Sequence, residues 1–184
     1  MSTVDQTSRK RLPREVIGLT GVTASGKTIV AHILEGFGFK YTSLRDMVRY
    51  ELIERNMPVT RENLKFFEEQ LITKHGRNIL AVYARSYIIS TGGPYWVVEG
   101  LINPQQIAEF RKLPSFFLVG TRAPTNVIFE RMHKRKRRMD IVRMNDLEER
   151  LNREMSDENG GLYWNISRCL ELADYIIDND IQYN

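Results

Sequence analysis

A chain of 184 residues is the size of one domain, and its 42% hydrophobic and 27% charged residues are ordinary for a globular protein. No apolar run approaches the ~20 residues that cross a bilayer, so we expect no membrane-spanning segment. The net charge of +4 suits anionic small molecules as well as nucleic acid. A single cysteine excludes an internal disulfide framework, and with three scattered histidines the sequence offers no zinc-type cluster.

The first 13 residues are polar and basic and lack the apolar core of a secretory signal. We expect residues 1–13 to form a flexible N-terminal arm. Its Arg-Lys-Arg run is interpreted as solvated rather than as a nucleic-acid or membrane contact. Because the one cysteine, Cys169, also fits a reducing compartment, we expect a cytoplasmic protein.

The first half of the chain alternates apolar runs with helical patterns. Residues 15–21 (EVIGLTG) predict a buried strand, and FKYTSL is a possible second one. Apolar spacing typical of helices, with capping and stop signals, predicts helices at 27–38, 43–56, 60–76 and about 77–90.

The second half continues the alternation. Strands are predicted at 95–101, 114–121 and 173–179, and helices at 104–112, about 124–137, 145–155 and shortly after Gly160-Gly161. Such alternation is typical of a parallel sheet covered on both faces. The nearly continuous apolar strands agree, because a central parallel strand is buried on both sides. We therefore predict a single α/β domain of three layers, with a central parallel sheet of about five strands and helices on both faces.

Residues 21–28 read G-V-T-A-S-G-K-T and match G-x-x-x-x-G-K-[ST] between a strand and a helix. In this pattern the glycines let successive N–H groups turn toward phosphate oxygens, and the helix N-terminus adds a positive dipole. Lys27 is expected to reach the β- and γ-phosphates and the Thr28 hydroxyl to bind Mg²⁺. We therefore predict the P-loop NTPase fold and a nucleotide site formed by Gly21, Ala24, Ser25, Gly26, Lys27, Thr28 and Ile29.

Glu99 follows the buried run Trp96-Val97-Val98. An acid at a strand end in this fold either holds the Mg²⁺ shell or activates a nucleophile. The competing interpretation is a polar strand-end residue that meets solvent. We place Glu99 in the site, as a metal-binding and catalytic candidate.

Three charged residues, Arg45, Asp46 and Arg49, open the helix after the second predicted strand, where ligands gather in open α/β sheets. All three are candidate substrate-binding residues: Arg49 to bind the phosphate of an acceptor, and Asp46 to contact its hydroxyl or base. The alternatives are a capping box between Ser43 and Asp46 and a surface ion-pair role for Arg49.

Residues 130–143 (ERMHKRKRRMDIVR) carry a dense run of Lys and Arg between two predicted helices. A lid at about 133–145 whose arginines close on the triphosphate is the favoured interpretation, because phosphoryl transfer needs cationic charge. A solvated basic face and a nucleic-acid patch are the alternatives; no aromatic residue is interleaved for base stacking. Arg135, Arg137 and Arg138 are the lid candidates.

Five segments together resemble the P-loop nucleoside monophosphate kinase superfamily, and most closely dephospho-CoA kinases and archaeal proteins related to them: GVTASGKT, SLRDMVRYE, WVVEGLINP, FERMHKRKRR and ADYIIDND. SLRDMVR is similar to the T-G-D-M-L-R segment of adenylate kinases, whose arginine holds the acceptor phosphate and corresponds to Arg49. ADYIIDND is similar to the A-D-x-x-I-x-N-D ending of dephospho-CoA kinases. The chain also resembles the kinase-like domain fused to some deoxycytidylate deaminases.

Two residues depart from the pattern of these relatives. Glu99 stands where they usually have Asp, and Ile102 stands where many have the arginine of D-G-I-R. Since Ile102 cannot bind a phosphate, the sequence leaves the acceptor open between dephospho-CoA and a (deoxy)nucleoside monophosphate.

The resemblance implies that residues 14–184 form one P-loop nucleotide kinase domain that uses ATP and Mg²⁺. Lys27, Asp46, Glu99, Arg137 and Arg138 are then the catalytic candidates. Its partners are a nucleoside triphosphate donor and a nucleotide-like acceptor. The alternatives are a nucleotide-sensing module without turnover, which Ile102 motivates, and a P-loop ATPase that binds nucleic acid, which the basic run motivates.

Overall fold

The computed structural model describes residues 12–135, 143–156 and 164–180. The predicted arm at 1–13 lies almost entirely outside these ranges, and so do Arg137, Arg138 and most of the predicted lid.

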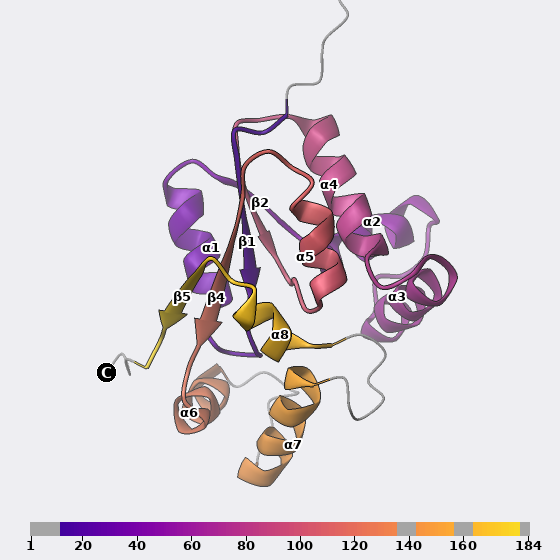
Figure 1. Ribbon diagram of the computed structural model, residues 1–184. Coiled ribbons are helices and arrows are strands. Elements are labelled where there is room, and N and C mark those ends of the chain that lie inside the picture. Colours follow the sequence, from indigo (N-terminus) through magenta and orange to yellow (C-terminus); the bar gives the residue numbers. More distant parts are fainter. Residues whose placement is uncertain (1–11, 136–142, 157–163, 181–184) are drawn as a thin grey trace, which may run out of the picture.

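The described strands form one parallel sheet in the order β2-β3-β1-β4-β5 (Figure 1). They are β1 (Glu15–Thr20), β2 (Lys40–Ser43), β3 (Tyr95–Glu99), β4 (Phe116–Arg122) and β5 (Tyr175–Asp178). The predicted parallel sheet of about five strands is confirmed. Because the strand pairs are parallel, consecutive strands are connected by crossovers, and these crossovers contain helices.

Helices connect the strands close to where the sequence predicts them. They are α1 (Lys27–Gly36), α2 (Leu44–Glu54), α3 (Arg61–His75), α4 (Ile79–Thr91), α5 (Pro104–Phe110), α6 (Thr125–Arg135), α7 (Met144–Met155) and α8 (Ile166–Glu171). In Figure 1, α1 lies on one side of the sheet and α4 and α5 on the other, while α6 and α7 lie beyond the carboxyl ends of the strands.

The core has a large and a small side. On the large side, Trp96 and Phe116 project from the sheet toward α2, α4, α5 and α8, and Phe116 stacks on Phe110 of α5 with ring centroids 5.5 Å apart. On the small side, Leu19 of β1 packs against Ala31 of α1. The three-layer arrangement with helices on both faces is therefore confirmed.

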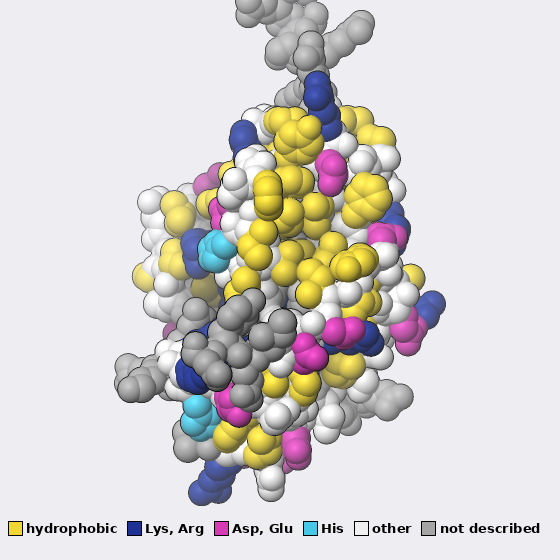
Figure 2. All heavy atoms as spheres, turned by 90° about the vertical axis from the view of Figure 1, so that its left-hand side faces the viewer, with side chains coloured by type: hydrophobic (Ala, Val, Ile, Leu, Met, Phe, Trp, Pro, Cys, Tyr) yellow, Lys and Arg dark blue, Asp and Glu magenta, His cyan; other side chains and the backbone are white. Residues whose placement is uncertain are grey.

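The small side leaves apolar side chains exposed to solvent. Figure 2 shows this face of the molecule. The exposed apolar side chains lie along and just after α1, on β4 and on the edge strand β5: Ile29, Ile33, Phe37, Phe117 and Tyr175. Within the described ranges, no helix has the length and apolarity needed to cross a membrane.

Cys169 of α8 is fully buried beneath the sheet, and burial raises the pKa of its thiol to about 12. Because the thiolate is the reactive form, we expect a thiol-specific reagent to leave the native protein unmodified at mildly alkaline pH. The same reagent should modify one thiol per chain in urea. Native-state modification at the rate of an exposed cysteine would contradict this burial.

Candidate functional site

The turn from β1 to α1 forms a cradle at the carboxyl end of the sheet. Gly21 and Gly26 have φ angles of +139° and +115°, which glycine adopts without strain. Ala24 has a φ of +59°, a left-handed conformation that is uncommon for a residue with a side chain. Ser25 Oγ donates to the Val22 carbonyl at 2.8 Å and lies 2.6 Å from Thr121 Oγ1. The loop is thus curled on itself and fixed to β4.

The cradle offers backbone donors that fit phosphate oxygens. In the described part of the chain, the N–H groups of Ala24, Gly26, Lys27 and Thr28 have no hydrogen-bond partner. Unpaired N–H groups at a helix N-terminus bind anions, because the helix dipole adds to their partial charges. This arrangement fits the phosphates of a nucleotide.

Lys27 lies at the mouth of the cradle, where its Nζ donates to the carbonyls of Gly21 and Val22 at 2.8 and 2.7 Å. Burial lowers the pKa of Lys27 from its ordinary 10.5, the carboxylates of Glu99 and Glu154 raise it in part, and Arg135 lowers it again. A cation confined among carbonyls and carboxylates can turn toward a phosphate by rotating its side chain.

Thr28 and Glu99 come together from α1 and β3. Thr28 Oγ1 donates to Glu99 Oε1 at 3.0 Å, and the hydroxyl of Tyr41 on β2 donates to Glu99 Oε2 at 2.9 Å. Burial and the Glu99 carboxylate raise the pKa of Tyr41 above its ordinary value, so it stays a donor. A hydroxyl beside a carboxylate suits the first shell of a Mg²⁺ ion that takes its other ligands from phosphates and water.

Among the described residues, no group of three or more His, Cys, Asp or Glu is arranged to hold a metal by itself. A nucleotide-dependent Mg²⁺ site needs no such group, since the phosphates supply part of the shell.

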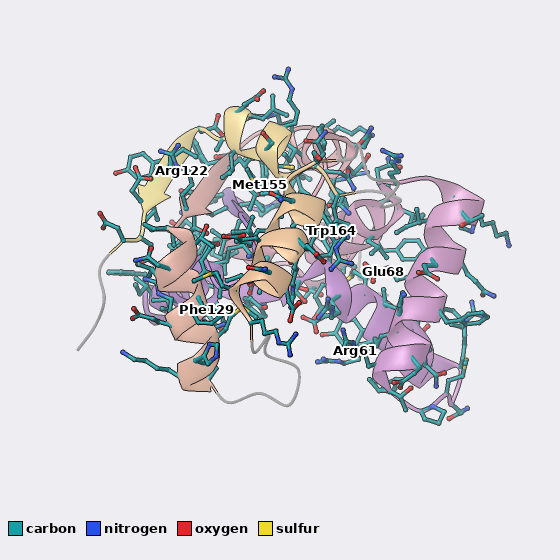
Figure 3. The ribbon with its side chains drawn as sticks, turned by 90° about the horizontal axis from the view of Figure 1, so that it is seen from below. Arg61, Glu68, Arg122, Phe129, Met155 and Trp164 are labelled. Atoms are coloured by element: carbon teal, nitrogen blue, oxygen red, sulfur yellow. The ribbon has the colours of Figure 1, made fainter. Side chains whose placement is uncertain are left out.

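A cleft of about 310 Å³ opens beside the cradle, in the size range of small-molecule sites. It is lined by the cradle and by residues from β2 to α8: Gly21, Thr23, Lys27, Tyr41, Ser43, Leu44, Arg45, Glu68, Leu80, Glu99, Gly100, Ile102, Gln106, Glu154, Trp164 and Ile166. Figure 3 looks onto this end of the molecule and shows Glu68 and Trp164 between α3 and α7.

The structure separates the charged residues predicted at the start of α2. Arg45 lines the cleft. Asp46 accepts from the Ser43 N–H and Oγ at 3.1 and 2.7 Å, and its own N–H donates to Ser43 Oγ, which completes a capping box. Arg49 pairs with Asp46 at 3.3 Å and is about half exposed, at 48%. Neither Asp46 nor Arg49 is among the described residues that line the cleft.

The predicted lid is described only at its two ends. Arg135 is exposed at the end of α6, and its charge acts on Lys27. Arg137 and Arg138 lie outside the described residues, so their predicted role stays a prediction.

Ile102 lines the cleft and packs with a cluster that includes Val22 of the loop. Its N–H donates to Gln106 Oε1 at 2.9 Å. Gln106 is fully buried, and its Nε2 has no partner among the described residues. A buried donor without a partner is costly, so a ligand that accepts a hydrogen bond there would remove that cost.

Several contacts to the cradle could not be predicted from local sequence patterns. Asn179, beyond β5, donates to the Ser25 carbonyl at 3.0 Å and accepts from Arg131 of α6 at 2.9 Å. Glu154 of α7 accepts from the Thr23 N–H at 2.7 Å. Asn179 lies in the ADYIIDND segment, whereas nothing in the local sequence around Glu154 connects it to a loop 131 residues earlier.

Comparison with known proteins supports the fold. Residues 17–155 match the family described as AAA domain. A UPF0200 protein of Pyrococcus abyssi is 32% identical over 170 residues, which cover 90% of this chain and 87% of that protein. A UPF0200 protein of Methanococcus maripaludis is 26% identical over 171 residues, covering 92% and 90%. The crystal structure of shikimate kinase from Bacteroides thetaiotaomicron matches with a TM-score of 0.51 at 14% identity, covering 89% and 85%.

The parallel sheet, the glycine-bent loop and these likenesses define a P-loop α/β domain with a kinase-like fold. The chain belongs to the AAA domain family and, more narrowly, to the UPF0200 proteins. The P-loop part of the predicted resemblance is confirmed, and its dephospho-CoA kinase branch stays a prediction.

Proposed function

We propose that this protein is an ATP- and Mg²⁺-dependent phosphotransferase that moves the γ-phosphate of ATP to a nucleotide-like small molecule. The observation that carries the proposal is that three parts come together in the cradle, beside a cleft that Lys27 and Glu99 line: unpaired loop N–H groups, the Lys27 ammonium, and the Thr28 and Glu99 pair. Phosphoryl transfer depends mainly on positioning and charge neutralisation, which these parts supply.

The donor half of the site is assigned to the loop. The N–H groups of residues 24 and 26–28 would bind phosphate oxygens, and Lys27 would neutralise their charge. Thr28 and Glu99 would hold Mg²⁺, which offsets the negative charge of the phosphates when the nucleotide is bound. The Tyr41 hydroxyl holds the Glu99 carboxylate in place.

The acceptor half is assigned to the cleft. Arg45 is the arginine of α2 that lines it, and Trp164 and Leu80 offer apolar surface. The Gln106 amide supplies a donor. Dephospho-CoA and (deoxy)nucleoside monophosphates are the two acceptor candidates, and both carry a base and phosphates for these groups.

A nucleotide-sensing module without turnover is the second candidate. The position of Ile102 favours it, because the side chain in the cleft is apolar where a phosphate acceptor would need a cation. A nucleic-acid-binding ATPase is less favoured; a steep fall of binding with salt would support it.

The proposal predicts phosphate transfer from Mg-ATP to one member of a panel that holds dephospho-CoA and each nucleoside monophosphate. Products are identified by mass spectrometry, and Lys27→Ala serves as the matched control. We expect one acceptor to gain a single phosphate with stoichiometric ADP.

The other outcomes of this experiment reject the phosphotransferase. If the protein binds ATP but phosphorylates no acceptor above the Lys27→Ala control, the phosphotransferase is rejected and the sensing module stands. If ATP does not bind, both are rejected.

A further inference from the structure

Glu154 on the last turn of α7 is a buried carboxylate, only 3% exposed, that contacts the phosphate loop directly. Its Oε2 accepts from the Thr23 N–H at 2.7 Å, and its Oε1 accepts from the Thr23 hydroxyl at 2.6 Å. One side chain thus takes both the backbone and the side-chain donor of a single loop residue.

Arg150, one helical turn earlier, completes the network. Its Nε donates to Glu154 Oε1 at 3.0 Å, and its Nη2 donates to the Thr23 hydroxyl at 2.9 Å. The guanidinium therefore neutralises the buried carboxylate and fixes the orientation of the hydroxyl, which accepts from Arg150 while it donates to Glu154.

Apolar contacts join the same two elements. Val22 and Ala24, which flank Thr23, belong to one buried cluster with Leu147 and Leu151 of α7. Helix α7 therefore holds residues 22–24 of the loop in two ways: by the charged hydrogen-bond network at Thr23 and by apolar contacts of the residues on either side of it.

This part of the loop, residues 22–24, includes an unfavourable backbone conformation. Ala24 has a φ of +59°, and a left-handed residue with a side chain persists only where its surroundings hold it. Glu154 accepts the hydrogen bond of the Thr23 N–H. The N–H groups of the later loop residues have no partner in the described part of the chain: Ala24, Gly26, Lys27 and Thr28.

We propose that Glu154 is a positioning residue for the phosphate loop: by holding Thr23, it keeps the loop in its phosphate-binding shape before a ligand arrives. A loop that is already ordered binds its ligand more tightly, because none of the binding free energy is needed to order it. The inference rests on the proposed nucleotide binding by this loop.

The opposite effect is also physically possible, which makes the test decisive. A carboxylate beside an anion site repels phosphate, so its neutralisation would tighten nucleotide binding if repulsion dominated. Positioning and repulsion therefore predict opposite changes in affinity for the same substitution.

The test measures the dissociation constants of Mg-ADP and Mg-ATP by calorimetry for Glu154→Gln, Thr23→Val and Thr23→Ser. The exposed Glu148 of the same helix provides the matched control Glu148→Gln. We expect Glu154→Gln to weaken the binding of both nucleotides about tenfold, because the NH₂ group of the glutamine amide is a donor where the network needs an acceptor. Thr23→Val should weaken the binding of both nucleotides about threefold. Thr23→Ser and Glu148→Gln should bind them with the affinity of the native protein.

Two further measurements separate positioning from a general structural role. The Thr23→Val, Glu154→Gln double variant should bind no more weakly than Glu154→Gln alone, since both changes break one network. In the nucleotide-free protein, exchange of the Thr23 amide hydrogen should be at least about tenfold faster in Glu154→Gln than in Glu148→Gln.

The outcomes distinguish this inference from the proposed function. If the native protein binds neither nucleotide, the proposed function fails. If it binds them and Glu154→Gln binds equally or more tightly, the positioning role is overturned while the proposed function stands. Should Glu154→Gln fail to fold, the difference between Thr23→Val and Thr23→Ser decides, and equal affinities overturn the proposal.

Discussion

Replacing Lys27 with alanine is expected to lower ATP turnover by about 100-fold or more, the range seen when one preorganised charge or donor is removed from a transition-state site. The ammonium lies 2.8 and 2.7 Å from two loop carbonyls and is within the fields of Glu99 and Glu154. Alanine removes the one cation that the loop itself contributes to the phosphates. Turnover is measured as ADP release from Mg-ATP with the acceptor identified by the panel.

The free energy of unfolding provides the control for this variant. Removal of a buried ammonium relieves its desolvation and offsets the two lost hydrogen bonds, so we expect stability to change by no more than about 1–2 kcal/mol. Because burial lowers the pKa of Lys27 below 10.5, the unfolded chain binds its proton more tightly. The stability contribution of Lys27 therefore rises as the pH approaches 10.5 from below, and Lys27→Ala should lack this rise. Native-like turnover in a folded variant would remove Lys27 from the proposed site.

Replacing Gly21 with alanine is expected to destabilise the fold by about 3 kcal/mol or more and to abolish nucleotide binding. The residue has a φ of +139°, and an added Cβ would clash with the Thr121 carbonyl and lie 2.8 Å from Ser25 Oγ. The backbone atom cannot move aside without disturbing β4, so the loop must shift instead. Urea unfolding measures the loss, and calorimetry with Mg-ADP measures the binding.

Gly38 provides a matched control, because its φ is +90° and, beyond its chain neighbours, no heavy atom of the described residues lies within 4 Å of an added Cβ. Gly38→Ala therefore carries backbone strain alone, and we expect a loss of about 1 kcal/mol with nucleotide binding unchanged. Equal losses in the two variants would show that the contact with Thr121 is not what constrains Gly21.

The sequence predicts the elements of this fold because two local signals agree. Apolar runs such as Trp96-Val97-Val98 are buried on both faces of a parallel strand, and the helices carry caps such as Ser43 and stops such as Gly76. The strand order depends on which runs pair across the sheet, and no local pattern encodes that pairing.

The candidate residues of the donor half could be proposed from local sequence patterns. Lys27 and Thr28 follow from the loop motif, and Glu99 follows from its place at a strand end. The residues of the acceptor half could not be predicted in this way. A spacing of three residues puts Asp46 and Arg49 on one face of the helix, but it does not decide whether each binds a substrate or a neighbouring side chain. Asp46 caps its own helix, whereas the carboxylate that binds Thr23 of the loop is Glu154, far away in sequence.

The cradle is assembled from distant parts of the chain, since residue 25 is held by Asn179 and residue 23 by Glu154. A partly folded chain that has not yet docked its last strand and α7 therefore lacks a complete binding surface. Any ligand of the cradle binds the fully folded state alone, so it should raise the melting temperature in proportion to the logarithm of its concentration above the dissociation constant. The melting temperature thus reports directly on occupancy of the cradle, and a thermal-shift screen can find its ligands whatever reaction the protein catalyses.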